Sequence, residues 1–208
     1  MIRVLLADDH TLVREGLKQL LASAPGIAIA GEAGDGDTAL ALVRANDYDV
    51  AVLDLSMPGL AGIDLIKRVK LEKPRLRVLV LSMHGEQQYA ARALKAGASG
   101  YLTKDSAAAQ LASVIRKIAA GGVHISETAA ALLIDGSASA DAPPHTRLSD
   151  REFEIFRALV AGEGASDIAN RLHLSVKTVS THKTRILQKM GMASAAELVR
   201  YAVEKKLL

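Results

Sequence analysis

Five short apolar runs alternate with five segments of helical spacing over the first 121 residues, and this alternation restricts the possible folds more than any other feature of the chain. The runs lie at 3–7, 27–33, 50–54, 78–82 and 100–103 and are rich in valine, leucine and isoleucine. Strands that alternate regularly with helices are typical of a parallel sheet with helices on both faces. The sequence therefore predicts an α/β fold with a five-stranded, doubly wound parallel sheet.

The segments between these runs predict helices that end at glycine or proline. Helices are expected at 12–24, 36–45, 60–73, 86–96 and 106–120. Thr11 is expected to cap the first helix and Ser106 to open the last, because hydroxyl side chains commonly cap helix N-termini.

Polar side chains stand where four of the five predicted strands end. Asp54 closes the run at 50–54, and Asp8 and Asp9 follow the first run. Ser82 and Lys104 follow the last two runs. The carboxyl ends of parallel strands meet at one edge of the sheet, where ligands bind. An isolated Asp54 would most simply be a turn residue, but four such strand ends indicate a site.

The residue types at this edge suit phosphoryl transfer. Three carboxylates brought together repel one another unless a cation lies among them, and hard oxygen ligands favour Mg²⁺. Lys104 can hold a phosphoryl oxygen, Ser82 offers a hydroxyl, and a carboxylate can act as the nucleophile. Phosphatases of the haloacid dehalogenase type would need a second Asp two residues after the nucleophile, where this chain has Ser56. The glycines between Gly31 and Gly36 are not spaced as in a dinucleotide-binding loop.

Composition excludes several other classes of protein. The chain has no cysteine, which rules out disulfides, thiolate metal sites and a Cys nucleophile. No apolar run approaches the roughly 18 residues of a membrane span, so a cytoplasmic protein without a membrane partner is expected. The six histidines show no pair at metal-ligand spacing, and six aromatic residues are too few for base-stacking platforms.

The second half of the chain predicts a different kind of domain. Residues 122–147 include a small, polar, proline-ended stretch and are predicted to be a linker between residues 1–121 and 148–208. The final segment has no strand signal, and it predicts an all-α domain of four helices near 150–161, 165–172, 176–190 and 194–205. Ser149 and Glu152 stand at capping-box spacing at its start, and Ser175 is expected to cap the third helix.

The third of these helices is basic, although the net charge of the whole chain is only +3. With the helix before it and the short turn at 173–175, it has the length of a helix-turn-helix unit. A basic helix can also be a solvated surface, but short donors and cations here could approach phosphates and base edges. The predicted DNA-binding residues are Lys177, Thr178, Ser180, Thr181, His182, Thr184, Arg185 and Lys189.

These residues resemble a known family in both halves of the chain. Asp8-Asp9, Asp54, Met57-Pro58-Gly59, Ser82 and Lys104 resemble the flavodoxin-like receiver domain of two-component response regulators. The stretches at 148–152 and 177–182 resemble the LuxR-type helix-turn-helix of the NarL/FixJ subfamily. The chain departs from that pattern at Ser180, where Lys is frequent, and at Lys183, where an apolar residue is usual.

The resemblance implies a DNA-binding transcription regulator, not an enzyme, that binds double-stranded promoter DNA. It implies that a sensor histidine kinase phosphorylates Asp54 and that Ser82 and Tyr101 form the switch pair. It further implies Mg²⁺ held by Asp9, Asp54 and the Ser56 carbonyl, with Asp8 acting through water, and a homodimer on phosphorylation. A DNA-binding protein with a vestigial receiver and a stand-alone aspartyl-phosphate phosphatase are the rival interpretations.

Overall fold

The computed structural model describes residues 1–60, 62–82, 87–126, 130, 143–172, 174–205 and 207. The chain divides into two compact units, residues 1–136 and 137–208, called here the N-terminal and C-terminal units.

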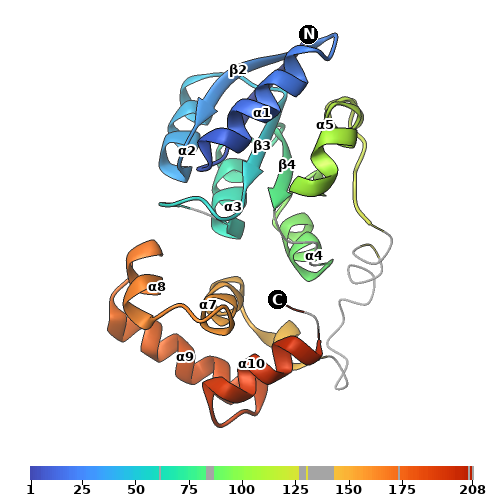
Figure 1. Cartoon of the computed structure of the whole chain (residues 1–208). Helices are drawn as coiled ribbons and strands as arrows, with labels where there is room; N and C mark the ends of the chain where they lie inside the picture. Colours follow the sequence, from blue (N-terminus) through green and yellow to red (C-terminus); the bar gives the residue numbers. More distant parts are fainter. Residues whose placement is uncertain are drawn as a thin grey trace. The chain divides into compact units, whose positions relative to one another are not determined.

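The N-terminal unit is built on one parallel sheet (Figure 1). Its strands are β1 (Ile2–Ala7), β2 (Ile27–Ala33), β3 (Val50–Asp54), β4 (Arg77–Ser82) and β5 (Gly100–Thr103). The strand order is β2-β1-β3-β4-β5, and every neighbouring pair is parallel. The predicted five-stranded parallel sheet is therefore confirmed.

Helices cover both faces of this sheet. They are α1 (Thr11–Ala22), α2 (Gly36–Ala45), α3 (Gly62–Glu72), α4 (Gln87–Lys95) and α5 (Lys104–Ala119). Helix α1 packs beside α5, whereas α2 packs beside α3, and α3 packs beside α4. The sheet is thus doubly wound, as the alternation predicts.

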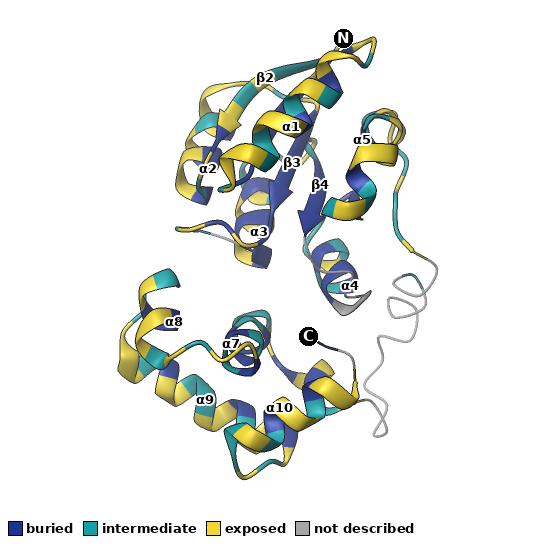
Figure 2. Ribbon diagram, in the orientation of Figure 1, coloured by how far each residue is buried: buried dark blue, intermediate teal, exposed yellow. Residues whose placement is uncertain are grey.

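The core lies between the central strands and these helices. All five residues of β3 are buried, which explains why its sequence is a continuous apolar run and not an alternating one (Figure 2). On one face, Val52 and Leu81 pack in the same cluster as Leu111 of α5. Each fully buried Leu or Val contributes about 1.5–3 kcal/mol relative to an exposed one.

Two predicted helix starts are wrong. Helix α1 begins at Thr11 itself, and His10 is the N-cap residue but makes no capping hydrogen bond with its side chain. Helix α5 begins at Lys104, two residues before the predicted start, because the Thr103 side chain accepts a hydrogen bond from the Ser106 N–H. Lys104 therefore lies in the first turn of a helix and not at the end of a strand.

The chain after α5 returns to the edge of the sheet, within the predicted linker. The Tyr101 N–H donates to the His124 carbonyl at 2.9 Å, and the His124 N–H donates to the Ser99 carbonyl at 3.1 Å. A Cβ on Gly100 would lie 3.2 Å from the His124 carbonyl oxygen, so the glycine lets this segment approach closely.

The C-terminal unit is helical in the part that the structure describes. It contains the 3-10 helix η1 (Pro144–Arg147) and the helices α7 (Asp150–Val160), α8 (Ala165–Arg171), α9 (Val176–Met190) and α10 (Ala195–Glu204). Phe153 and Phe156 of α7 are fully buried and stack on each other. The predicted helical domain is confirmed, as are the Ser149–Glu152 capping box and the Ser175 cap.

Helix η1 lies within the predicted linker, but it packs on this unit. His145 is only 2% exposed, and its Nδ1 is hydrogen-bonded to the Tyr201 hydroxyl of α10. The last residues of the predicted linker are thus anchored to the helical core.

Candidate phosphoacceptor site and DNA interface

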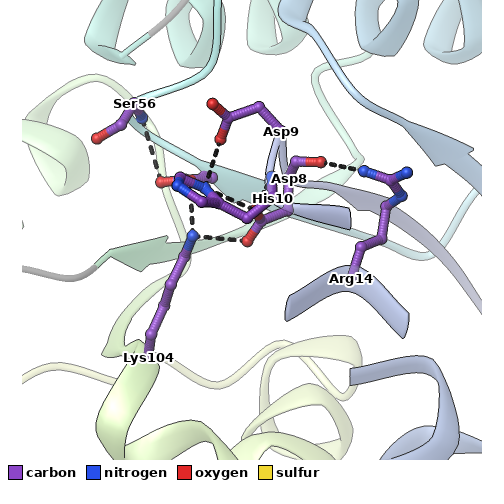
Figure 3. A network of polar contacts seen from close by, with 7 residues as sticks. Asp8, Asp9, His10, Arg14, Ser56 and Lys104 are labelled. Carbon is purple, nitrogen blue, oxygen red and sulfur yellow. Dashed lines mark hydrogen bonds and ion pairs between the residues drawn. The ribbon is translucent and has the colours of Figure 1, made fainter. Parts of the chain in front are cut away.

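The sheet brings the predicted acids and Lys104 together at the carboxyl ends of its strands (Figure 3). Asp8 and Asp9 follow β1, Asp54 ends the neighbouring strand β3, and Lys104 opens α5. The parallel sheet and the first turn of α5 therefore bring Lys104 into contact with Asp54, which lies 50 positions before it in the chain.

Lys104 bridges two buried carboxylates. Its Nζ lies 2.8 Å from Asp54 Oδ2 and 2.7 Å from Asp8 Oδ2. The three side chains are 6%, 2% and 1% exposed for Lys104, Asp54 and Asp8. The second Asp54 oxygen, Oδ1, accepts a hydrogen bond from the Ser56 N–H at 3.1 Å.

Burial and pairing act in opposite directions on these groups. Burial raises the pKa of Asp54, and the hydrogen bond from Lys104 offsets this only in part. For Lys104, burial alone would lower the pKa, but hydrogen bonds to Asp54 and Asp8 outweigh it and leave the pKa raised. The site therefore holds a charged lysine against a carboxylate that water solvates poorly, which favours acceptance of a new group by that carboxylate.

His10 joins the carboxylates at the same edge. Its Nδ1 lies 2.9 Å from Asp9 Oδ1 and 3.5 Å from Asp8 Oδ1. Potential ligand atoms of Asp8, Asp9, His10 and Asp54 all lie within 4.8 Å of one another. His10 belongs to no histidine pair in the sequence, and its position directly after Asp8-Asp9 is the signal that places it at this edge.

The pocket suits a divalent cation. Asp8 Oδ2 and Asp9 Oδ1 are buried atoms. Asp8 Oδ2 lies 2.7 Å from Lys104 Nζ, and Asp9 Oδ1 lies 2.9 Å from His10 Nδ1. Lys104 supplies one positive charge to the site, whereas Asp8, Asp9 and Asp54 carry three carboxylates. Carboxylate oxygens in this state are suitable ligands for Mg²⁺.

The predicted switch residues both lie inside the N-terminal unit. Ser82 is the last residue of β4 and is 1% exposed, and Tyr101 on β5 is 8% exposed. Val80, two residues before Ser82, is the register partner of Tyr101. Tyr101 is thus a buried residue in this structure.

Helix α9 presents most of the predicted DNA-binding residues to solvent. Lys177, Ser180, Thr181, Thr184, Arg185 and Lys189 are exposed, and Thr178 and His182 are half-buried. The hydroxyls of Thr181 and Thr184 donate to the backbone carbonyls one turn earlier, at 2.9 and 3.1 Å. Their oxygens keep free lone pairs, so each can accept a further hydrogen bond.

Two of the predicted residues are directed toward the domain itself. Lys189 Nζ donates to Glu152 Oε2 at 2.6 Å, which ties α9 to the start of α7. His182 Nδ1 is a buried atom that has no hydrogen-bond partner among the described residues. Burial lowers the pKa of His182, which favours its neutral form. DNA contacts by Lys189 and His182 therefore stay predictions.

The two halves of the chain match two different families of known proteins. The response regulator receiver domain matches residues 4–116, and the model for bacterial regulatory proteins of the luxR family matches residues 146–202. The chain belongs to the two-component response regulators of the NarL/FixJ subfamily. This family consists of DNA-binding transcription regulators and not of enzymes.

Relatives match the chain along nearly its full length. Response regulator UvrY of Escherichia coli K12 is 33% identical over 205 residues, which cover 98% of this chain and 94% of that protein. Oxygen regulatory protein NreC of Staphylococcus epidermidis is 35% identical over 216 residues and covers 100% and 99%. The expected joint presence of both domains is therefore confirmed.

Solved structures of RcsB from Salmonella are similar to the chain as a whole. One from Salmonella typhimurium gives a TM-score of 0.77 at 29% identity and covers 98% of this chain and 97% of that one. Another, of RcsB bound to the promoter rprA with the phosphomimetic BeF₃⁻, gives a TM-score of 0.71 at 29% identity and covers 96% and 97%.

Among the described helices, none has the length and apolar character needed to cross a bilayer.

Proposed function

We propose that the chain is a transcription regulator that binds promoter DNA and is switched when a sensor histidine kinase phosphorylates Asp54. The observation that carries this proposal is the buried Asp54 carboxylate at the end of β3, 2.8 Å from Lys104 Nζ. An acid that only capped or turned the chain would not need a buried lysine beside it.

The chemistry follows from these neighbours. An Asp54 oxygen attacks the phosphorus of a phosphohistidine, the P–N bond breaks, and its electron pair stays on the imidazole nitrogen of the kinase. Lys104 can then follow the negative charge onto the phosphoryl oxygens, and the Ser82 hydroxyl can donate to one of them. Mg²⁺, when bound, would neutralise charge that develops during the transfer.

The proposed metal ligands are Asp9, Asp54 and the Ser56 carbonyl, with Asp8 acting through water. The proximity of the Asp8, Asp9 and Asp54 carboxylates supports this assignment.

For the switch, we propose that the Ser82 hydroxyl moves toward the phosphoryl group and that Tyr101 changes its packing on β5. The backbone hydrogen bond from Tyr101 to His124 supports a route from this strand to the residues that follow α5. A shift of β5 would thereby reach the start of the linker through two backbone hydrogen bonds.

For the output, we propose that α9 enters the major groove and that Lys177 and Arg185 contact phosphates. The exposed row of short donors and cations on α9 supports this, as does the promoter complex of the similar protein RcsB. Base readout is assigned to Thr181, and the remaining contacts to Thr178, Ser180 and Thr184.

We further propose that two copies pair on phosphorylation through α10. Val199 and Val203, one turn apart on this helix, are 36% and 59% exposed although Leu198 and Ala202 beside them are fully buried.

We assign residues 1–121 to the receiver, 122–147 to the linker and 148–208 to the DNA-binding domain. Promoter DNA as the partner implies the cytoplasm as the place of action.

Incubation with acetyl phosphate and Mg²⁺ tests the central proposal, with intact-mass measurement as the readout. The wild-type chain should gain one phosphoryl group, because Asp54 ends the central strand β3 beside Lys104 and the neighbouring acids Asp8 and Asp9. Asp54→Asn should gain none. Asp105→Asn is the matched control, since it removes an exposed acid next to Lys104, and it should label like the wild type. Equal labelling of Asp54→Asn would reject Asp54 as the acceptor.

A further inference from the structure

We propose that Arg14 is a positioning residue of the phosphoacceptor site: its guanidinium fixes the Asp8 carbonyl and thereby orients the Asp9 carboxylate as a metal ligand. The inference rests on the metal role proposed above for Asp9. It gives a function to a cation of α1 that binds the backbone at this edge of the sheet and none of the three pocket carboxylates.

Arg14 binds the backbone directly beside the acidic pair. Its Nη1 donates to the Asp8 carbonyl oxygen at 2.6 Å, and its side chain is only 17% exposed (Figure 3). The guanidinium also pairs with Glu32 of β2, whose Oε2 lies 3.7 Å from Arg14 Nε. A hydrogen bond from a charged donor is stronger than one between neutral groups. The Asp8 carbonyl is therefore held in one orientation.

The N–H of Asp8 is held as well. It donates to the Ala33 carbonyl at 3.1 Å, which continues the pairing of β1 with β2 beyond the last residue of β1. Asp8 as a whole is fully buried. Arg14 and β2 thus fix both backbone groups of Asp8 at the point where the chain leaves the sheet.

Asp9 takes its orientation from this arrangement because the peptide unit is planar. The Asp8 carbonyl and the Cα of Asp9 lie in one plane, so a fixed carbonyl also fixes the point from which the Asp9 side chain extends. The Asp9 side chain is 29% exposed, and its partner His10, whose Nδ1 lies 2.9 Å from Asp9 Oδ1, is 59% exposed. Mg²⁺ requires near-octahedral geometry with bonds of about 2.0–2.1 Å. A rotation of this peptide would therefore weaken its binding.

The charge of Arg14 and its hydrogen bond have opposite effects on Mg²⁺ affinity. A cation near the pocket repels Mg²⁺, so removal of the charge alone should leave the affinity unchanged or raise it. Loss of the hydrogen bond should lower the affinity. Lys18, one turn further along α1, offers the matched comparison: it carries the same charge and also pairs with Glu32, at 2.9 Å, but its partners among the described residues are Glu15 and Glu32.

The test is calorimetric titration of Mg²⁺ into the full chain and into Arg14→Met, Arg14→Lys and Lys18→Met, well below their melting temperatures. Arg14→Met should lose roughly tenfold in Mg²⁺ affinity, as is common when a group that orients a metal ligand is removed. Arg14→Lys can still donate to the carbonyl and should lose less. Lys18→Met should stay within about twofold of the wild type, since it removes a cation without touching the Asp8 carbonyl.

A second measurement separates positioning from a general loss of stability. The rate of labelling by acetyl phosphate should be lower in Arg14→Met at limiting Mg²⁺ and approach the wild-type rate at saturating Mg²⁺, because Asp54 and Lys104 are unchanged. A rate that stays low at saturating Mg²⁺, with unchanged Mg²⁺ affinity, would contradict the inference.

Two further results would overturn it. If Arg14→Met binds Mg²⁺ as tightly as the wild type or more tightly, Arg14 acts only through its charge. If Lys18→Met loses as much affinity as Arg14→Met, the effect comes from the shared partner Glu32 and not from the Asp8 carbonyl. Asp9→Asn separates these outcomes from the metal role itself: unchanged Mg²⁺ binding in that variant would reject the metal role, whereas a loss there without a loss in Arg14→Met rejects only the inference about Arg14.

Discussion

Glu152 connects the start of α7 to the end of α9 through one side chain. Its Oε2 accepts from the Ser149 N–H at 2.8 Å and from Lys189 Nζ at 2.6 Å, so it caps α7 and binds the end of α9. Burial alone would raise the pKa of Glu152, but the hydrogen bonds from Lys189 and Ser149 lower it overall. The carboxylate is therefore more stable in the folded unit than in the unfolded chain.

Glu152 therefore makes the stability of the C-terminal unit depend on pH, and its lowered pKa determines the direction of that dependence. A carboxylate whose folded pKa is depressed stabilises the fold above its unfolded pKa, about 4.5, and loses that contribution as pH falls through the folded value. Glu152→Gln should weaken the protection of α7 and α9 amides at pH 7 by about 1 kcal/mol, since Lys189 is partly exposed.

Native-state hydrogen exchange of the full chain measures this loss. The difference between Glu152→Gln and wild type should shrink as pH falls from about 4.5 through the lower folded pKa of Glu152, because protonation makes the wild-type side chain neutral like Gln. Glu154→Gln, which alters an acid on the same helix paired with Arg151, is the control and should leave Lys189 unaffected. Equal protection of Glu152→Gln and wild type at pH 7 would disprove the stabilising role.

The sequence predicts the position of Asp54 better than it predicts the orientation of the His10 side chain. An acid at the end of an apolar run is visible in the chain order, because strand ends share one edge. The orientation of a side chain at a helix N-cap depends on how the loop turns, which no local pattern encodes. The Lys189–Glu152 pair joins residues 37 positions apart, so spacing along α9 alone could not separate Lys189 from the outward cations.

Among the helices, α9 has the sequence pattern that indicates its function most directly. Ser175 caps it, Val179 and Ile186 anchor it in the core, and Gly191 ends it with a left-handed backbone at φ 66°. The opposite side carries cations and short hydroxyl side chains. That side can approach DNA without losing any core contact.

Phosphate contacts and base contacts on α9 should respond differently to substitution. Lys177→Ala and Arg185→Ala should each weaken binding to all DNA sequences and reduce the salt slope by about 0.9 per lost phosphate contact. Thr181→Val should instead change base preference. Binding isotherms on specific and random duplexes at several salt concentrations measure both effects.

Arg200→Ala, which removes an exposed cation from α10, is the control for a general loss of positive charge. If Lys177→Ala and Arg185→Ala match Arg200→Ala in both affinity and slope, α9 is not the helix that contacts the phosphates.

Element boundaries were harder to predict than the elements themselves. The start of α5 depends on whether Thr103 or a later residue caps it, and the sequence offers hydroxyls at both Thr103 and Ser106. The composition of residues 122–147 predicts a linker, yet His124 pairs with β5 and His145 is buried against Tyr201. Both contacts are tertiary, so a local pattern cannot reveal them.

In the whole molecule, phosphorylation of the N-terminal unit has to change a property that affects how the C-terminal unit binds DNA. The phosphoryl group adds negative charge beside Ser82 and Lys104, and it shifts the chain only by its differential affinity for two states. If the favoured state pairs two copies through α10, the dimer places two α9 helices on one DNA site. The response to phosphorylation should then be partial at low concentration and steeper at high concentration.

Beryllofluoride with Mg²⁺ should therefore convert the chain from monomer to dimer, as measured by light scattering during size-exclusion chromatography. Val203→Asp places a charge on the exposed apolar side of α10 and should abolish the dimer, while acetyl phosphate still labels Asp54. Val123→Asp is the matched control, because Val123 is 51% exposed and lies in the N-terminal unit. Its dimerisation should remain intact. A Val203→Asp chain that dimerises and binds DNA like the wild type would place the pairing surface on another element, and phosphorylation would then act on DNA binding without α10.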